Sequence, residues 1–168
     1  MNHGDAEKMA FEAKTRNLIF ALVAALLTGL ALYAIVAPLY QPPAKNILFT
    51  RQAPEPIGPY SQGVQYGDFV FISGQIGLDP VTGNLPATVD GQTIQVMENL
   101  KAILAEAGLD FTSVVQTRIF LTDLQDFTTV NGVYQRYFEG AYPARATVQV
   151  AGLPKGAKVE IEMVAMRR

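Results

Sequence analysis

Two charged side chains that could together form a site for a small acid lie near the carboxyl end of the chain. Arg145 stands in the segment Tyr142-Pro143-Ala144-Arg145, and Glu160 stands in Lys158-Val159-Glu160-Ile161-Glu162. An arginine guanidinium holds a carboxylate through two parallel hydrogen bonds, and a glutamate positions or activates a water molecule. The pair therefore outlines a site for a small organic acid, if the fold brings the two side chains together.

The composition excludes several other kinds of site. The 168 residues include no cysteine, and the single histidine, His3, lies in the polar amino-terminal tail. Disulfides, thiolate chemistry, histidine-ligated metals and a Ser-His-Asp triad are therefore not available to the globular part. From residue 46 to 168, nine Lys and Arg stand against twelve Asp and Glu, a net charge of about −3. This balance does not predict a nucleic-acid surface.

A membrane-length apolar segment, Leu18 to Ala37, precedes the globular part. It contains no charged residue, and Thr28 is its one clearly polar side chain. About 20 helical residues at roughly 1.5 Å each span the hydrocarbon core of a bilayer. We expect a transmembrane helix at residues 18–40, after a polar tail at residues 1–17 and before a proline-rich linker at residues 41–46.

Two other interpretations of the apolar segment remain open at the level of sequence. A cleaved signal peptide has a shorter apolar region, and here Pro38 directly follows the one suitable small-residue site, Val36-Ala37. A helix buried in a soluble core would show a polar face at helical spacing, which this segment lacks. An uncleaved anchor fits the pattern best.

Basic residues are slightly more numerous before the segment than after it. Lys8, Lys14 and Arg16 precede it, and Lys45 and Arg51 are the nearest that follow. Cytoplasmic flanks of membrane helices are enriched in Lys and Arg. We therefore expect a single-pass membrane protein with a cytoplasmic amino terminus. The globular part would lie in the periplasm or another extracytoplasmic space.

The globular part, residues 47–168, opens with a strand pair and a helix. Strands are expected at residues 64–66 and 69–73, since Gly67-Asp68 between β-forming residues indicates a hairpin turn. A helix is expected from Gly91 to Ala107, with Gly108 at its carboxyl end. Its apolar face follows helical spacing through Ile94, Met97, Leu100, Ile103, Leu104 and Ala107.

A third strand, a second helix and two closing strands complete the pattern. The strand is expected at Val114–Leu121 and the helix at Leu124–Phe138, with Asp123 as its amino-terminal cap. The closing strands are expected at Ala146–Val150 and Lys158–Met166. This order predicts an α+β fold in which two helices cover one face of a mostly antiparallel sheet. The second helix carries an apolar stripe for the core: Phe127, Val130, Tyr134, Tyr137 and Phe138.

The last strand has two unlike faces. Val159, Ile161 and Met163 point to one side, and Glu160 and Glu162 point to the other with Lys158 and Val164. A face that mixes glutamates with branched apolar residues suits neither solvent nor a core. We expect it to pack against another copy of the chain, which predicts a homo-oligomer.

Eight motifs in this part of the chain have the order and spacing of a known family. They are Ile57-Gly58-Pro59-Tyr60-Ser61-Gln62, Phe71-Ile72-Ser73-Gly74-Gln75-Ile76, Asp79-Pro80-Val81-Thr82-Gly83, Glu98-Asn99-Leu100-Lys101-Ala102-Ile103-Leu104, Phe120-Leu121-Thr122-Asp123-Leu124-Gln125-Asp126-Phe127, Val130-Asn131-Gly132-Val133-Tyr134, Pro143-Ala144-Arg145 and Leu153-Pro154-Lys155-Gly156-Ala157. On these motifs, residues 47–168 resemble the RidA/YjgF family. The resemblance implies a chorismate-mutase-like fold and a homotrimer with clefts between subunits. It also implies cofactor-free hydrolysis of reactive 2-imino acids, or their enamine tautomers, to 2-oxo acids and ammonia.

The same resemblance assigns expected roles to site residues. Arg145 would bind the substrate carboxylate with help from the backbone N–H of Gly74. Glu160 would position the attacking water, and Tyr60 would lie over the substrate and supply a hydroxyl group. Thr147 stands where the family commonly has a cysteine whose backbone contributes to the pocket. Ser73 and Asn131 are expected as hydrogen-bonding residues beside the substrate.

Three alternatives stay open. From the residues themselves, an ion pair that holds two strands or subunits together explains Arg145 and Glu160 as well as a site does. The apolar segment also permits an accessory subunit of a membrane complex that uses the fold for assembly without catalysis. Ribonuclease or translation inhibition, an activity also attributed to the resembled family, fits the acidic globular part less well.

Overall fold

The computed structural model describes residues 3–39 and 42–167, and the chain forms two compact units that divide between Pro42 and Pro43. The first unit is one long helix, α1 (His3–Val36), followed by a short 3-10 turn, η1 (Ala37–Leu39). Residues 40 and 41, at the end of the expected membrane helix and the start of the expected linker, lie outside the described residues.

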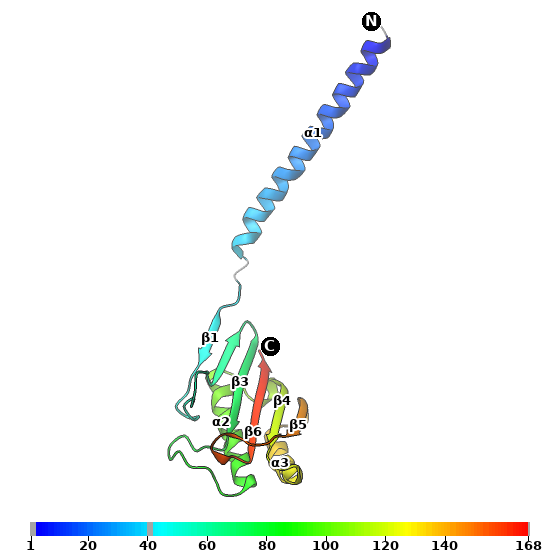
Figure 1. Cartoon of the computed structure of the whole chain (residues 1–168). Coiled ribbons are helices and arrows are strands. Elements are labelled where there is room, and N and C mark those ends of the chain that lie inside the picture. Colours follow the sequence, from blue (N-terminus) through cyan, green and yellow to red (C-terminus); the bar gives the residue numbers. More distant parts are fainter. Residues whose placement is uncertain (1–2, 40–41, 168) are drawn as a thin grey trace. The chain divides into compact units, whose positions relative to one another are not determined.

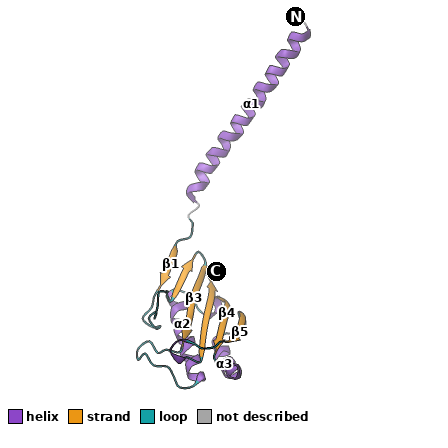
Figure 2. Ribbon diagram, viewed as in Figure 1, coloured by secondary structure: helices purple, strands orange, loops and turns teal. Residues whose placement is uncertain are grey.

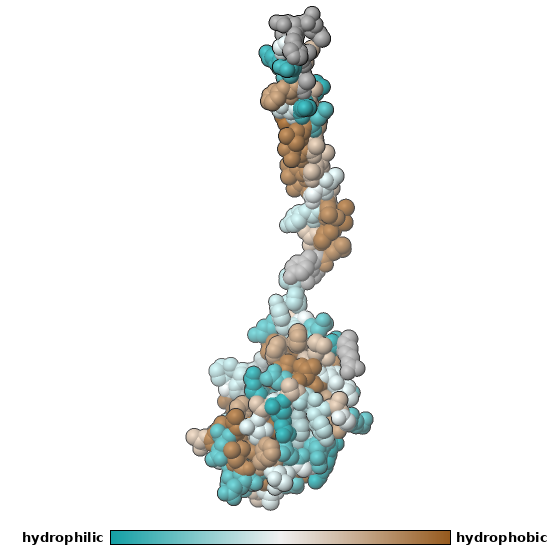
Figure 3. Space-filling view, turned by 90° about the vertical axis from the view of Figure 1, so that its right-hand side faces the viewer, coloured by the Kyte–Doolittle hydropathy of each residue, from teal (hydrophilic) through white to brown (hydrophobic). Residues whose placement is uncertain are grey.

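Helix α1 begins before the apolar segment and includes most of the stretch that the sequence suggested as a polar tail. That stretch is rich in Ala, Glu, Lys and Met, which are good helix formers and extend a helix once the next turns have formed. The segment Glu7–Leu39 is long and apolar enough to cross a membrane by length and composition. Figure 3 shows apolar side chains (brown) along this helix beyond its polar beginning.

The second unit is built on a sheet of six strands: β1 (Lys45–Leu48), β2 (Gly63–Tyr66), β3 (Phe69–Ile76), β4 (Val114–Leu121), β5 (Ala144–Gln149) and β6 (Val159–Met166). The strand order is β1-β2-β3-β6-β4-β5 (Figure 1). Strands β4 and β5 run parallel, and the other neighbours are antiparallel. The expected hairpin is confirmed, with Gly67 at a positive φ of 59° in its turn.

The sequence reasoning did not identify strand β1. Its four residues directly follow the proline-rich segment, which was read as a linker, and its first three side chains are exposed. A strand this short, with no clear alternation, carries little sequence signal. It forms because its backbone pairs with β2, in the register Ile47↔Val64.

The helices of this unit are α2 (Val89–Glu106) and α3 (Phe127–Tyr134), which cover one face of the sheet (Figure 2). Thr88 caps α2 by accepting the Gly91 N–H at 3.1 Å, and Gly108 follows its end at a φ of 69°. The cap and the glycine therefore fix the two ends of α2 close to the expected bounds. Short 3-10 turns lie in the connections: η2 (Phe111–Ser113), η3 (Leu124–Asp126), η4 (Gln135–Tyr137) and η5 (Pro154–Gly156).

The single second helix expected over 124–138 is wrong in detail, because only its middle part, Phe127–Tyr134, is α-helical. Asp123 does act as a cap, accepting the Gln125 N–H at 2.9 Å, but the turn that follows is the 3-10 turn η3. The α-helical part contains two threonines, two valines and a glycine, which are weak helix formers. Such a short segment closes into tighter turns at both ends.

The core lies between the sheet and the helices. Strand β6 contributes Val159, Ile161 and Met163 to the core, as the alternation predicts. Helix α2 contributes Leu100, Ile103 and Leu104 to the same cluster. Two expected core residues are exposed instead: Ile94 (39%) and Phe127 (40%). Ile94 lies on the outer side of α2 at helical spacing. Phe127 lies at the amino end of α3, where its ring is partly open to solvent.

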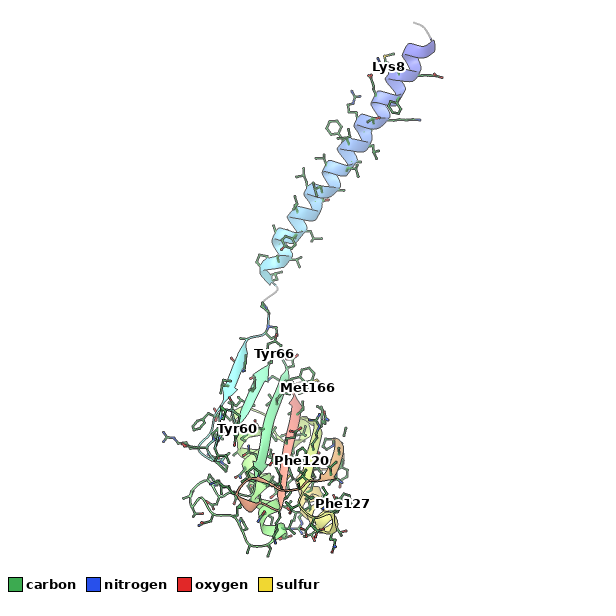
Figure 4. The ribbon with its side chains drawn as sticks, viewed as in Figure 1. Lys8, Tyr60, Tyr66, Phe120, Phe127 and Met166 are labelled. Atoms are coloured by element: carbon green, nitrogen blue, oxygen red, sulfur yellow. The ribbon has the colours of Figure 1, made fainter. Side chains whose placement is uncertain are left out.

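The opposite side of the sheet, which we call the open face, is not covered by α2 or α3, the two α-helices described in this unit. Strand registers place its residues in rows, such as Tyr66, Phe69 and Met166 at one end and Phe71 beside Val164. Tyr66 and Met166 lie at the same end of the sheet (Figure 4). Each of the aromatic side chains in these rows is about half exposed. The open face also carries Glu160 and Glu162 of β6, so it mixes large apolar and acidic side chains.

Candidate active site

The expected site residues other than Thr147 fall into two groups, each of which lines its own pocket. The glutamate pocket has a volume of about 290 Å³ and is lined by Ile57, Tyr60, Ser73, Gly74, Ile76, Pro154 and Glu160. The arginine pocket has a volume of about 520 Å³ and is lined by Asn131, Tyr134, Gln135, Tyr142, Pro143 and Arg145. Thr147 lies two residues after Arg145 on β5.

A bulge in β3 shapes the glutamate pocket. The pairing of β3 with β6 shifts between Ile72 and Gln75, so Ser73 and Gly74 fall in the irregular part of the ladder. The Ser73 hydroxyl donates to the Ser61 carbonyl at 2.6 Å, and its N–H donates to the Gln62 carbonyl at 3.0 Å. These bonds attach the bulge to the loop before β2, which carries Tyr60.

The buried Gln62 amide holds that loop in place. Its Nε2 donates to the carbonyls of Thr50, Ala53 and Pro54 at 2.9 to 3.1 Å, and its Oε1 accepts the Thr50 N–H at 2.7 Å. At the tip of the loop, the Tyr60 hydroxyl accepts the Ile57 N–H at 3.2 Å. Tyr60 is 47% exposed, so its ring remains open to a ligand or to a second subunit.

Gly74 allows the Glu160 side chain to lie across β3. A Cβ built on Gly74 would be 2.0 Å from Glu160 Oε1 and 2.8 Å from its carboxyl carbon. Any residue larger than glycine must therefore push the carboxylate away. The glycine of the Ser73-Gly74 bulge is required by this close approach.

Replacing Gly74 by alanine is expected to reduce kcat/KM for a substrate of this site by roughly 10²-fold, the cost of a displacement of about 1 Å. The backbone of Gly74 is not at positive φ, so the variant should fold, and a thermal melt checks this. Gly152→Ala is the matched control, because a Cβ there has no neighbour within 4 Å. Full activity of Gly74→Ala would show that the position of Glu160 is not important.

The Glu160 carboxyl is held in an environment that disfavours its charge. It is half-buried, and burial raises its pKa, with a further increase from the like charge of Glu162. Glu162 itself is bound by Arg118, whose Nη1 lies 2.5 Å from Oε1. A carboxyl with a raised pKa takes up and returns a proton more readily than an ordinary exposed glutamate.

Aromatic rings and a free hydroxyl surround Arg145 in the arginine pocket. Its guanidinium carbon is 5.0 Å from the centre of the Tyr134 ring and 5.8 Å from that of Phe127. The Tyr134 hydroxyl shares a hydrogen bond of 3.0 Å with Thr117 Oγ1, and burial raises its pKa. In the described part of the chain, Thr147 Oγ1 is buried without a hydrogen-bond partner.

Arg145 and Glu160 do not meet within one chain. Arg145 pairs with Thr117 of β4, which pairs with Met163, so these residues share the face covered by the helices. Glu160 pairs with Phe120, which pairs with Val148, and this row belongs to the open face. The two side chains therefore leave opposite faces of the sheet. An ion pair between them that joins two strands of one chain is accordingly wrong.

Sequence reasoning missed three residues that contact the charged side chains of the candidate site. Tyr134 and Phe127 were assigned to the core stripe, although their rings flank the Arg145 guanidinium. Arg118 was passed over, although the alternation of the strand Val114–Leu121 turns it away from the core-facing Thr117 and Ile119. That alternation was the available signal, but the partner of Arg118 lies 44 residues away. Within the described residues, no group of three His, Asp or Glu is placed to hold a metal ion.

Comparisons with known proteins match the globular unit. The family model described as endoribonuclease L-PSP matches residues 50–167. Protein DfrA of Myxococcus xanthus is 57% identical over 126 residues, which cover 73% of this chain and 96% of DfrA. The mouse 2-iminobutanoate/2-iminopropanoate deaminase is 49% identical over 124 residues, which cover 73% of this chain and 92% of that enzyme.

Solved structures agree with the sequence matches. The crystal structure of Escherichia coli TdcF with bound serine superposes with a TM-score of 0.72 at 48% identity, covering 73% of this chain and 99% of TdcF. The fold expected from the sequence is thereby confirmed, as a mixed sheet with helices over one face. The chain belongs to the RidA/YjgF family, whose model is described as endoribonuclease L-PSP.

Proposed function

We propose that this protein hydrolyses 2-imino acids, such as 2-iminopropanoate and 2-iminobutanoate, to 2-oxo acids and ammonia. The observation that carries the proposal is the glutamate pocket, where a half-buried carboxyl with a raised pKa lies across a glycine beside Tyr60. Its relatives at 48–49% identity include mammalian enzymes named 2-iminobutanoate/2-iminopropanoate deaminase. The reaction class fits a site of one arginine, one glutamate and hydroxyl groups.

The active site is composed of two subunits of a homotrimer. Because Arg145 and Glu160 lie on opposite faces of one sheet, a substrate that touches both must lie between two copies of the chain. The occupant of the open face is a second copy, since its exposed aromatic rows offer a large apolar surface. The glutamate pocket of one subunit then faces the arginine pocket of the next.

Each residue has a distinct role in this composite site. Arg145 binds the substrate carboxylate, and the flat rings of Tyr134 and Phe127 keep the guanidinium in place. The Gly74 N–H contributes a second bond to the carboxylate, and Tyr60 covers the substrate. Hydrogen bonds from three further residues complete the pocket, namely Ser73, Asn131 and Thr147, of which Thr147 Oγ1 has an unused bonding capacity.

Glu160 handles the protons of the reaction. It accepts a proton as the water oxygen bonds to C2 of the protonated imine, and a tetrahedral amino alcohol forms. It then returns the proton to nitrogen, the C–N bond breaks as the hydroxyl group loses its proton to solvent, and ammonia leaves as the 2-oxo acid forms. Orientation supplies several kcal/mol, up to about 7–11 in ideal cases, and acid-base help adds typically about 10²- to 10⁴-fold.

The test is ammonia release by the purified full chain in mild detergent. An amino-acid oxidase generates 2-iminopropanoate from alanine in situ, and the catalysed rate is compared with the rate without the protein. We expect a clear acceleration. A folded trimer that gives none would contradict the deaminase and favour an assembly role for the fold.

Helix α1 anchors the enzyme to a membrane, with residues 18–40 in contact with lipid. The apolar composition of Glu7–Leu39 supports this proposal. The excess of Lys and Arg before the apolar segment supports a cytoplasmic amino terminus, with the globular unit on the other side of the membrane. The expected linker, residues 41–46, is shorter than the sequence suggested, because β1 (Lys45–Leu48) already belongs to the globular unit.

The full chain is expected in the membrane fraction after carbonate washing, whereas residues 43–168 alone should remain in the supernatant. The physical reason is that about 20 apolar residues insert in an effectively irreversible way. Protease added to sealed vesicles of known orientation then reports the side of the globular unit. Replacing Leu22 and Leu26 together by arginine should release the chain, and full retention of that variant would contradict an anchor.

A further inference from the structure

The charged pair Arg118–Glu162 lies beside the acid-base residue of the proposed site and has no role in it so far. Arg118 is on β4 directly opposite Glu162 of β6, in the row next to the one that pairs Glu160 with Phe120. We propose that Arg118 is a positioning residue for Glu160: it binds Glu162 and thereby keeps a second carboxylate from repelling the one that handles the water. This inference rests on the proposed function.

The carboxylates of Glu160 and Glu162 are close enough to repel each other. Glu160 and Glu162 are two residues apart on one strand and leave the same face, so their Cα atoms are about 6.6 to 6.8 Å apart. The open face is partly buried already in one subunit, which weakens screening by water. Without a cation, the Glu162 charge would favour protonation of Glu160 or turn its carboxylate away from β3.

Arg118 is well placed to prevent this. Its guanidinium reaches the Glu162 oxygen at 2.5 Å, and the two side chains are 55% and 33% exposed. Even with this pair formed, burial and the like charge of Glu162 raise the pKa of Glu160. The arginine therefore offsets only part of the repulsion, and its removal should increase what remains.

The other charged groups around Glu160 do not replace Arg118. In the described chain, β3 (Phe69–Ile76) contributes no titratable side chain, and Arg145 leaves the other face of the sheet. The remaining titratable side chains near the glutamate pocket are Tyr60 and the exposed Glu55 on its loop, and the exposed Lys155 and Lys158 before β6. Neither lysine forms an ion pair among the described residues.

Substitutions of Arg118 and of Glu162 are expected to shift the pH dependence of activity in opposite directions. Arg118→Gln leaves the Glu162 charge uncompensated, so the Glu160 pKa rises further. The acid limb, which is the fall of kcat/KM toward low pH as Glu160 becomes protonated, then moves to higher pH. At pH values on the acid side of this limb, activity falls about three- to tenfold. Glu162→Gln removes the like charge and moves the limb to lower pH. A merely structural loss would not produce shifts of opposite sign.

The experiment measures the pH dependence of kcat/KM for the full chain in detergent, with 2-iminopropanoate generated from alanine by an amino-acid oxidase in excess. Arg118→Lys should restore most of the wild-type limb, because it restores the charge. Lys101→Gln is the matched control, since it removes the cation of an exposed ion pair with Glu98 on α2. It should leave the limb unchanged.

A second readout does not depend on activity. Infrared titration follows the carboxyl band of Glu160, which is assigned by its loss in Glu160→Gln, in the wild type and in Arg118→Gln. An unchanged Glu160 titration in Arg118→Gln, or shifts of the same sign in both variants, would overturn the inference. An inactive wild type with the expected infrared shift would instead contradict the proposed function and leave the coupling established.

Discussion

Arg145→Ala is expected to lower kcat/KM for 2-iminopropanoate by roughly 10²- to 10³-fold, the usual cost of removing one partner of a buried charge pair. In the described chain Arg145 has no carboxylate within ion-pair distance, and its guanidinium lies against two aromatic rings. It is thus available to a ligand carboxylate. Steady-state ammonia release over a range of oxidase-supplied substrate gives the measurement.

Two further variants make this result specific. Arg145→Lys keeps the charge but loses the planar fork, so it should recover about tenfold of the lost activity at most. Arg136→Ala, which removes an exposed arginine outside both pockets, should behave as the wild type. The melting temperature of Arg145→Ala should change little, because an exposed cation–π contact contributes only about 0.5–1 kcal/mol. Activity of Arg145→Ala near that of the wild type would refute the carboxylate role.

Mixed trimers of Arg145→Ala and Glu160→Gln subunits are expected to regain activity that neither variant has alone. If each site takes Arg145 from one subunit and Glu160 from its neighbour, any mixed cyclic trimer contains one intact site, or about one third of wild-type activity. Opposite placement of the two side chains on one sheet is the physical reason. Glu160→Gln alone should lose roughly 10²- to 10⁴-fold.

The mixed trimers are obtained by co-expressing the two variants with different affinity tags and purifying through both tags in turn. Trimers of Arg145→Ala that carry both tags serve as the control and should stay inactive. If the mixed trimers are as inactive as their parents, the residues that act together come from one subunit. A mass other than that of a trimer would contradict the assembly itself.

Local sequence patterns predicted the structure correctly where residues close together in the sequence determine it. The hairpin around Gly67, the strand Val114–Leu121 and the alternation of Val159, Ile161 and Met163 were all predicted and are all present. Each depends on a turn or on side-chain periodicity over a few residues. The failures were the missed strand β1 and the single helix expected over 124–138, and both concern short segments whose structure depends on what they pack against.

The sequence by itself determined the residue types of the candidate site, the approximate positions of its strands and the family of the globular unit. Only the tertiary structure decided that the side chains of Arg145 and Glu160 lie on opposite faces of the sheet and that Glu162 is bound by Arg118. Alternation fixes the relative faces of residues within one strand. It says nothing about two strands, because their relation depends on register and on the parallel pairing of β4 with β5, which are set by long-range backbone hydrogen bonds.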